Sequence, residues 1–282
     1  MLGIGLGLCS SLCWGVSDFI AGTQSRRMPV LRVLLVSQSL GFVGVGIVVA
    51  IRGTGPPSFV QLLPAIGGGL AGTAALGAFY RALAIGSMSI VAPISATGVA
   101  LPVIVGIADG DRPAAVQLLG IVGAIIGVVL ASREHGPGVP DDARAASRTT
   151  VALSLLAAVG FGCYFIGIRS SARHDVLWTL FASRGAASAM LLGAALAARP
   201  SGQLHAADLI PLSAVGLLDV SATGVYGLAT RHGALSEVAV AAALYPLATV
   251  VLARVVLGER VRRIQELGIV AAIAGVALIA AG

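Results

Sequence analysis

The chain has 282 residues, of which 57% are hydrophobic and only 11% are charged. A soluble domain of this length must keep its exterior wet, so this composition excludes an ordinary soluble protein and predicts an all-α membrane protein. The formal net charge of +6 comes from arginines that stand singly or in pairs between apolar runs. No basic stripe with interleaved aromatic residues is present, and nucleic-acid binding is therefore not expected.

Apolar spans of about twenty residues, each long enough to cross the core of a bilayer, follow one another along the chain. Ten such transmembrane helices are expected near 2–22, 31–51, 61–81, 87–108, 114–132, 151–169, 175–198, 208–230, 234–256 and 263–281. The one long polar stretch lies between spans five and six. The predicted organisation is a first five-helix repeat over 1–132, a polar linker over 133–150 and a second five-helix repeat over 151–282.

An internal repeat supports the division into two halves. The segments Gln117–Ala131 and Gln265–Ile279 are 148 residues apart and are identical at ten of fifteen positions. The same offset aligns Gly110-Asp111-Arg112 with Gly258-Glu259-Arg260. Because five is an odd number, a second copy of a five-helix unit enters the membrane in the opposite direction. The halves are therefore expected to be inverted repeats with a binding site at their interface.

Ionisable residues inside the spans are candidate functional groups, because a charge at the centre of a bilayer costs about 2.5–3.5 kcal/mol on insertion scales. Arg184 lies near the middle of span seven and Asp219 at the centre of span eight. Counting from their shared loop places them roughly 4–5 Å apart in depth, at 1.5 Å per residue. A contact between them is predicted. It either neutralises both charges and locks the helices together, or it gates or binds a charged substrate or a proton.

Other polar and aromatic residues extend this candidate site. Asp219, Thr223 and Tyr226 recur along one face of span eight, as expected for a helix that lines a water-accessible cavity. Span one offers Trp14 and Asp18, although Asp18 also lies close enough to the end of its span to be hydrated at the membrane surface. Aromatic residues of spans three and nine complete the predicted substrate or ion pathway, which consists of Trp14, Asp18, Tyr80, Arg184, Asp219, Thr223, Tyr226 and Tyr245.

Prolines within the spans predict helix bends, because each removes a backbone donor and frees a carbonyl. Pro93 and Pro102 lie in span four, and Pro246 lies in span nine. The four histidines have no partner at metal-ligand spacing, so no metal site is expected. The sequence has no phosphate-binding glycine loop and no HExxH or GxSxG motif. Neither a cofactor nor an enzymatic activity is therefore predicted.

Several short motifs carry a resemblance to a known family. Trp14-Gly15 in span one is matched by Phe161-Gly162 in span six, and each half ends in a glycine-bearing helix. The second half also has Tyr245-Pro246 followed by Gly258-Glu259-Arg260. In this combination the chain resembles the drug/metabolite transporter superfamily, in its EamA-type form with two EamA repeats. The first half departs from the pattern, because Gly98 stands at the position aligned with Pro246 and Asp111 replaces the glutamate.

The resemblance implies a ten-helix fold of inverted repeats with a central cavity lined by helices one, three, four, six, eight and nine. It also implies a secondary transporter of a small metabolite or drug-like compound, mostly an efflux carrier. We expect alternating access with proton or ion coupling, Asp219 as the coupling carboxylate, and a multi-pass location in a bacterial plasma membrane. The expected partners are a small-molecule substrate and the lipid bilayer, and self-association into a homo-oligomer is left open. The alternatives are a non-transporting membrane scaffold or sensor, or a lipid-handling flippase of the same fold.

Overall fold

The computed structural model describes residues 2–101, 105, 114–131, 141–199, 204–232, 242, 244–260 and 262–281. Across these ranges the chain forms α-helices and one 3₁₀ turn and contains no β-strand. The first half contains α1 (Leu2–Ser25), α2 (Val30–Arg52), α3 (Phe59–Ile85), α4 (Met88–Ala96), the turn η1 (Thr97–Val99) and α6 (Ala115–Ala131). The second half contains α7 (Asp141–Ala172), α8 (Val176–Ala198), α9 (Ala206–His232), α11 (Tyr245–Val256) and α12 (Arg263–Ala281).

The length and surface of these helices suit a bilayer. Five helical segments are long and apolar enough to cross a membrane, namely Val30–Arg52, Phe59–Ile85, Ser147–Ala172, Val176–Ala198 and Ala206–Tyr226. Large apolar side chains such as Ile51, Val60 and Ile210 remain exposed. Such a surface is unfavourable in water and favourable against lipid. The chain is thus a multi-pass membrane protein.

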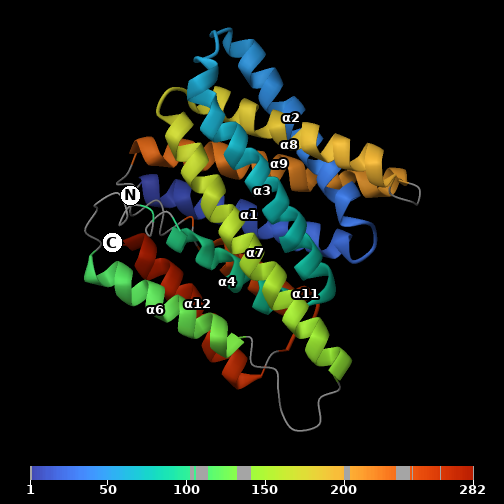
Figure 1. Ribbon diagram of the computed structural model, residues 1–282, viewed down its shortest axis with the longest axis vertical. Coiled ribbons are helices and arrows are strands. Elements are labelled where there is room, and N and C mark those ends of the chain that lie inside the picture. The colour runs from blue at the N-terminus through green and yellow to red at the C-terminus, as the bar shows by residue number, and fades with distance from the viewer. Residues whose placement is uncertain are drawn as a thin grey trace.

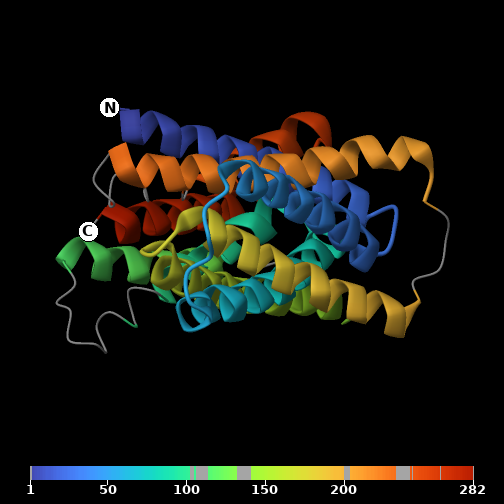
Figure 2. The same ribbon diagram turned by 90° about the horizontal axis from the view of Figure 1, so that it is seen from above.

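The helices pack in pairs that each combine one helix from either half. α1 packs against α9 and α3 against α7, while α2 packs against α8 and α6 against α12. In chain order α1 corresponds to α7, α2 to α8, α3 to α9 and α6 to α12. Exchanging the halves therefore converts the α1–α9 pair into the α3–α7 pair, and it leaves the α2–α8 and α6–α12 pairs unchanged. Figure 1 shows α6 and α12 side by side at one end of the long axis, with α2 and α8 toward the other. α1 begins and α12 ends on the same side of the molecule (Figure 2).

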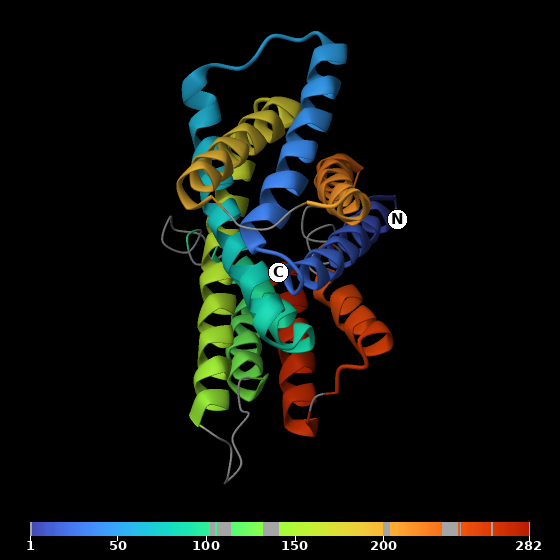
Figure 3. The same ribbon diagram turned by 90° about the vertical axis from the view of Figure 1, so that its right-hand side faces the viewer.

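Buried serines join the helices within two of these pairs. On α1, Ser10 Oγ donates to the carbonyl of Ala222 at 2.8 Å, and Ser17 Oγ donates to the carbonyl of Val215 at 3.1 Å. Both acceptors belong to α9, and Figure 3 shows these two helices lying together. On α7, Ser171 Oγ accepts a hydrogen bond of 3.0 Å from the Ala65 N–H of α3.

Glycines allow the backbones of α6 and α12 to approach closely. A methyl group on Gly127 would lie 2.6 Å from Ala272 Cα, and one on Gly275 would lie 2.7 Å from the Gly120 carbonyl oxygen. These distances are too short for a side chain. Small residues are favoured at such interfaces because lipid tails provide no hydrophobic drive between helices. Glycines of the two repeated segments therefore lie at the contact between α6 and α12.

The Trp14-Gly15 and Phe161-Gly162 motifs also occupy matching places. A methyl group on Gly15 of α1 would lie 2.6 Å from the Tyr245 carbonyl oxygen, at the start of α11. A methyl group on Gly162 of α7 would lie 2.8 Å from the Gly98 carbonyl oxygen, in η1. Each motif thus lets the first helix of one half approach the backbone of the other half. A side chain on Gly98 would in turn collide with α7, which explains why glycine stands there.

The structure departs from the predicted boundaries in the linker. Helix α7 begins at Asp141, so that 141–150, expected as linker, is helical. This segment is too polar to register as a span, but its Ala143, Ala145 and Ala146 are strong helix formers. Hydropathy alone therefore placed the start of this helix too late.

Spans four and nine also differ from continuous helices with a central bend. Pro93 is buried within α4, which ends at Ala96 and continues as a 3₁₀ turn. The described helix of span nine begins at Tyr245 and has Pro246 in its first turn, where the missing N–H breaks no helical hydrogen bond. Pro102 lies outside the described residues.

Candidate functional site

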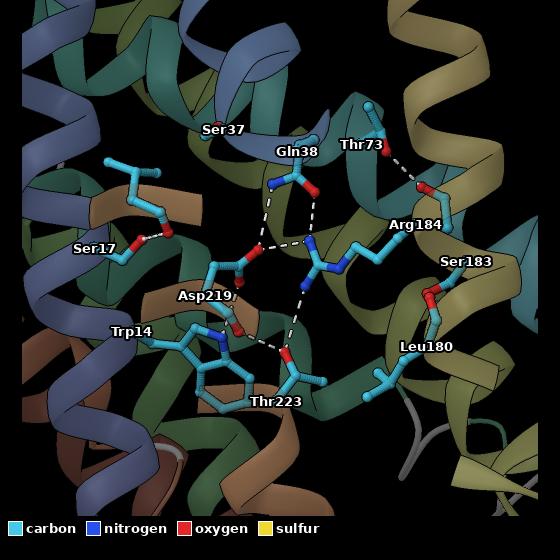
Figure 4. A network of polar contacts seen from close by, with 12 residues as sticks. Trp14, Ser17, Ser37, Gln38, Thr73, Leu180, Ser183, Arg184, Asp219 and Thr223 are labelled. Atoms are coloured by element: carbon cyan, nitrogen blue, oxygen red, sulfur yellow. Dashed lines mark hydrogen bonds and ion pairs between the residues drawn. The ribbon is translucent and has the colours of Figure 1, made fainter. Parts of the chain in front are cut away.

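The two charges predicted to meet do meet. Arg184 of α8 forms an ion pair with Asp219 of α9, with 2.6 Å between Nη1 and Oδ2. Helix α2 packs against both α8 and α9. The long side chain of Arg184 extends from α8 toward Asp219 on α9 (Figure 4). The contact that was predicted by counting residues from the shared loop is therefore confirmed.

Gln38 of α2 connects the two charged groups, and sequence analysis missed it. Nη1 of Arg184 donates to Gln38 Oε1, and Gln38 Nε2 donates to Asp219 Oδ2 at 3.3 Å. The amide is buried, so these bonds satisfy groups that would otherwise be costly. The signal that was available is a long polar side chain in the interior of the apolar span 31–51.

Thr223 and Trp14 complete this network (Figure 4). Arg184 Nη2 donates to Thr223 Oγ1 at 3.4 Å, and that hydroxyl donates to the Asp219 carbonyl oxygen at 2.8 Å. The Trp14 indole N–H donates to Asp219 Oδ1 at 3.1 Å. Both oxygens of the Asp219 carboxylate therefore accept hydrogen bonds. The Arg184–Asp219 pair is neutral as a unit, and both of its charged groups form further hydrogen bonds with neighbouring side chains.

The network forms part of the wall of a cavity that encloses about 710 Å³ of empty space, including the part open to solvent. Its lining residues come from α1, α2, α3, α7, α8, α9 and α11. The family resemblance implies a cavity lined by spans one, three, four, six, eight and nine. Spans two and seven, which are α2 and α8, also line it, and the described part of span four contributes no lining residue. The cavity therefore lies between helices of both halves.

Asp18 of α1 lines the same cavity but differs from Asp219 in its contacts. Its residue is only 8% exposed, so it does not lie hydrated at the membrane surface. No described residue forms a hydrogen bond or an ion pair with its carboxyl group. Its electrostatic interactions are with Asp219, a group of like charge, and with the phenol groups of Tyr80 and Tyr245. Of the two acidic residues in the described part of the cavity wall, Asp219 has a cationic partner and Asp18 has none among the described residues.

The remaining predicted residues divide between the cavity and the core. Tyr245 lines the cavity, and its ring centroid lies 6.5 Å from that of Trp14. The ring centroid of Tyr226 lies 6.0 Å from that of Trp14, but Tyr226 is not among the residues that line the cavity. Tyr80 is buried in the apolar core beside Phe79. Tyr164 of α7 lines the cavity and was not predicted, because a tyrosine in an apolar span carries no distinctive spacing.

A second polar cluster joins the halves at the end of α1. Glu259, which follows α11, forms a 3.0 Å ion pair with Arg26 and accepts a 2.8 Å hydrogen bond from the Ser87 hydroxyl. It also accepts backbone hydrogen bonds from Met88 at 3.2 Å and Ser89 at 3.1 Å, at the N-terminus of α4. Burial raises the pKa of Glu259, but these hydrogen bonds outweigh it and hold the pKa below its ordinary value.

No group of three or more His, Cys, Asp or Glu side chains within the described ranges is arranged to hold a metal ion. The site instead offers a neutral ion pair, one unpaired carboxyl group and an aromatic wall around Trp14, Tyr164 and Tyr245. These groups are suited to binding a small molecule by charge and by ring contacts.

Comparisons with known proteins agree with this architecture. The family model described as the EamA-like transporter family matches residues 1–133 and again residues 148–281. No curated protein matches the chain. A solved crystal structure superposes with a TM-score of 0.67 over 98% of this chain and 95% of the other, at 15% sequence identity, a level at which the likeness concerns the fold alone. Because the family model covers nearly the whole chain in two copies, the chain belongs to the EamA-like transporter family.

Proposed function

We propose that this protein is a secondary transporter that moves a small metabolite or drug-like compound across a bacterial plasma membrane by alternating access. The observation that carries the proposal is the cavity with charged and aromatic walls, enclosed by helices of both halves. Membership of a transporter family supports the same conclusion. No chemical conversion of the substrate is part of the proposal.

The transport mechanism that we propose uses two inverted five-helix repeats. Its support is the odd number of spans that the sequence predicts for each half, together with the exchange of the α1–α9 and α3–α7 pairs when the halves are swapped. The matching contacts of Gly15 and Gly162 with the opposite half give further support. In such an arrangement, each half offers the same set of contacts to the other on opposite sides of the membrane.

Alternating access requires contacts that form on one side of the cavity and break when that side opens. The Glu259 cluster is a candidate for such a contact, because it links the ends of α1 and α3 and the start of α4 to the loop after α11. We therefore assign the cluster the role of a closed gate. Coupling to a proton or another ion would act through the carboxyl groups of the cavity, and efflux is the direction that the family resemblance favours.

The test is uptake of labelled compounds by proteoliposomes that are preloaded with the same unlabelled compounds. The panel contains amino acids, sugars, nucleosides and organic cations. Leu76→Trp fills the cavity, because Leu76 of α3 lines it, whereas Leu70→Trp places the same ring on the outer surface of the same helix, where Leu70 is 39% exposed. Exchange that is abolished by Leu76→Trp and kept by Leu70→Trp supports the proposal.

Two outcomes contradict it. Exchange that survives Leu76→Trp in a folded variant places the pathway elsewhere. The absence of exchange for every class of compound argues against a carrier and favours a scaffold, a sensor or a lipid-handling flippase.

A further inference from the structure

We propose that Asp18, and not Asp219, is the exchange site of the cavity, where a proton and a monovalent organic cation bind in turn to the same carboxyl group. This inference rests on the proposed transport function and names its substrate class and its coupling group. It follows from the different partners of the two carboxyl groups that line the cavity.

Both oxygens of the Asp219 carboxylate already have partners. The Arg184 guanidinium lies 2.6 Å from Oδ2, and the Trp14 indole N–H lies 3.1 Å from Oδ1. The Gln38 amide donates a further hydrogen bond to Oδ2. A substrate cation could bind this carboxylate only by displacing Arg184, which would leave a buried cation without its partner, a strongly unfavourable change. Asp219 therefore serves to hold Arg184 and to shape the wall.

Asp18 has the opposite surroundings. Its carboxyl group is buried at the cavity wall, and within the described residues it has neither a hydrogen-bond donor nor a cation as a partner. A buried carboxylate without a partner is costly, whereas a protonated carboxyl group or a carboxylate paired with a bound cation is not. The position is thus suited to two alternative occupants, a proton and a cation.

The groups that face Asp18 from the neighbouring helices agree with this assignment. Helix α1 packs against α9, α11, α3 and α2. From these, Asp219 of α9, Tyr245 of α11 and Tyr80 of α3 interact electrostatically with Asp18, and α2 contributes the neutral Gln38 to the cavity. Among the described residues that line the cavity, Arg184 of α8 is the one cation, and its charge is balanced by Asp219.

The charges of the lining select the sign of the substrate. Among the described lining residues the charges of Arg184 and Asp219 cancel, so an ionised Asp18 gives this lining one net negative charge. An anionic substrate would meet this charge, and no described lining residue offers it an unpaired cation, whereas a cationic substrate would neutralise the charge. The rings of Trp14 and Tyr245 stand in the same wall and offer π faces to an ammonium group. The chemical class that fits is an amphipathic ammonium compound with a single positive charge.

The exchange step balances in atoms and charge. When the cation binds, the O–H bond of the protonated Asp18 carboxyl breaks and the proton leaves to the side on which the cavity is open. The carboxylate then pairs with the cation, and on the other side a proton displaces it. One positive charge is carried in each direction, so the cycle moves no net charge and a pH gradient drives it without a current.

The first test observes the proton directly and needs no transport. The C=O stretching band of a protonated carboxyl group is followed by infrared difference spectroscopy of the purified protein during a pH titration. Asp18→Asn should abolish one titrating band, Asp18→Glu should shift it in frequency and midpoint, and Glu259→Gln, which removes a carboxyl group outside the cavity, should leave it unchanged. A band that is unaltered in Asp18→Glu overturns the proposal, and this variant serves even if Asp18→Asn does not fold.

The second test uses trimethyl(2-phenylethyl)ammonium, whose charge is permanent, and 2-phenylethylammonium, with neutral 2-phenylethanol as the matched control. The protein is kept about one pH unit below the infrared midpoint in weak buffer, and proton release is measured on addition of each compound. Release should approach one proton per chain for a cation, and should be absent for 2-phenylethanol and in Asp18→Asn. If neither cation releases protons from the wild-type protein, the assignment of the substrate class is wrong.

The two proposals fail separately. Proton binding at Asp18 without exchange in proteoliposomes would contradict the transport function and leave the assignment of Asp18 intact. Exchange in proteoliposomes that is unaffected by Asp18→Glu, in its rate and in its pH dependence, would contradict the assignment and leave the transport function intact.

Discussion

Nη1 of Arg184 lies 2.6 Å from Oδ2 of Asp219, and the two side chains are only 8% and 14% exposed. Asp219→Asn leaves the arginine charge buried without its partner, and breaking a buried ion pair in this way typically destabilises a protein by about 3–5 kcal/mol. We expect the purified variant to unfold at a markedly lower temperature than the wild type in the same detergent.

The double variant Arg184→Met, Asp219→Leu removes both charges and is the control for this effect. Replacing a buried ion pair by apolar residues is often neutral in stability, so most of the lost Tm should return. If the double variant is as unstable as the sum of the two single variants, the pair is not an energetic unit and this interpretation is wrong.

The Glu259 cluster predicts a dependence of stability on pH. The folded-state pKa of Glu259 lies below its ordinary value. Its contribution is therefore present above the unfolded-state pKa of about 4.3 and is lost as the pH falls through the lower folded-state value. We expect Tm to drop toward acid pH more steeply in the wild type than in Glu259→Gln, measured by differential scanning fluorimetry.

At neutral pH the same Glu259→Gln variant should be less stable than the wild type by about 1–3 kcal/mol, since it loses charge-assisted hydrogen bonds with Arg26 and the start of α4. Parallel acid profiles of the two proteins would show that Glu259 does not contribute to the pH dependence.

Two glycines one turn apart on α6 offer a matched comparison. A methyl group on Gly127 would lie 2.6 Å from Ala272 Cα, whereas one on Gly123 would lie 3.5 Å from Gly275 Cα, an ordinary contact distance. Gly127→Ala should therefore lower the stability by about 1–3 kcal/mol through overpacking. Gly123→Ala should be neutral or slightly stabilising, because alanine favours helix. Equal effects on Tm would show that α6 and α12 are not in close contact.

Trp14→Phe removes one hydrogen bond and keeps an aromatic wall. The indole N–H donates to Asp219 Oδ1 at 3.1 Å, and a hydrogen bond to a charged group contributes about 1.5–3 kcal/mol. We expect a measurable loss in Tm, because the Asp219 carboxylate loses one of its hydrogen bonds. Tyr245→Phe, which removes a hydroxyl without a described hydrogen-bond partner, is the control and should keep the wild-type stability.

The sequence predicted those features that depend on hydropathy and on spacing along one helix. The two repeats and the contact between Arg184 and Asp219 follow from such local patterns. The role of Gln38 does not, because it depends on α2 lying beside both α8 and α9. The isolation of Asp18 is likewise a property of what surrounds it in space. The start of α7 was missed because a polar, alanine-rich helix gives no hydropathy signal.

The serine hydrogen bonds between α1 and α9 have a mechanical consequence. Ser10 and Ser17 are two turns apart, so they hold α1 to the α9 backbone at two separate heights. A motion that opens the cavity and keeps these bonds has to carry α1 and α9 together, with Asp18 and Asp219 at a fixed spacing. The α3–α7 pair, joined through Ser171, would move as the second body. The moving parts would then be helix pairs drawn from both halves of the chain, sliding past each other along the cavity, and not the two halves as such.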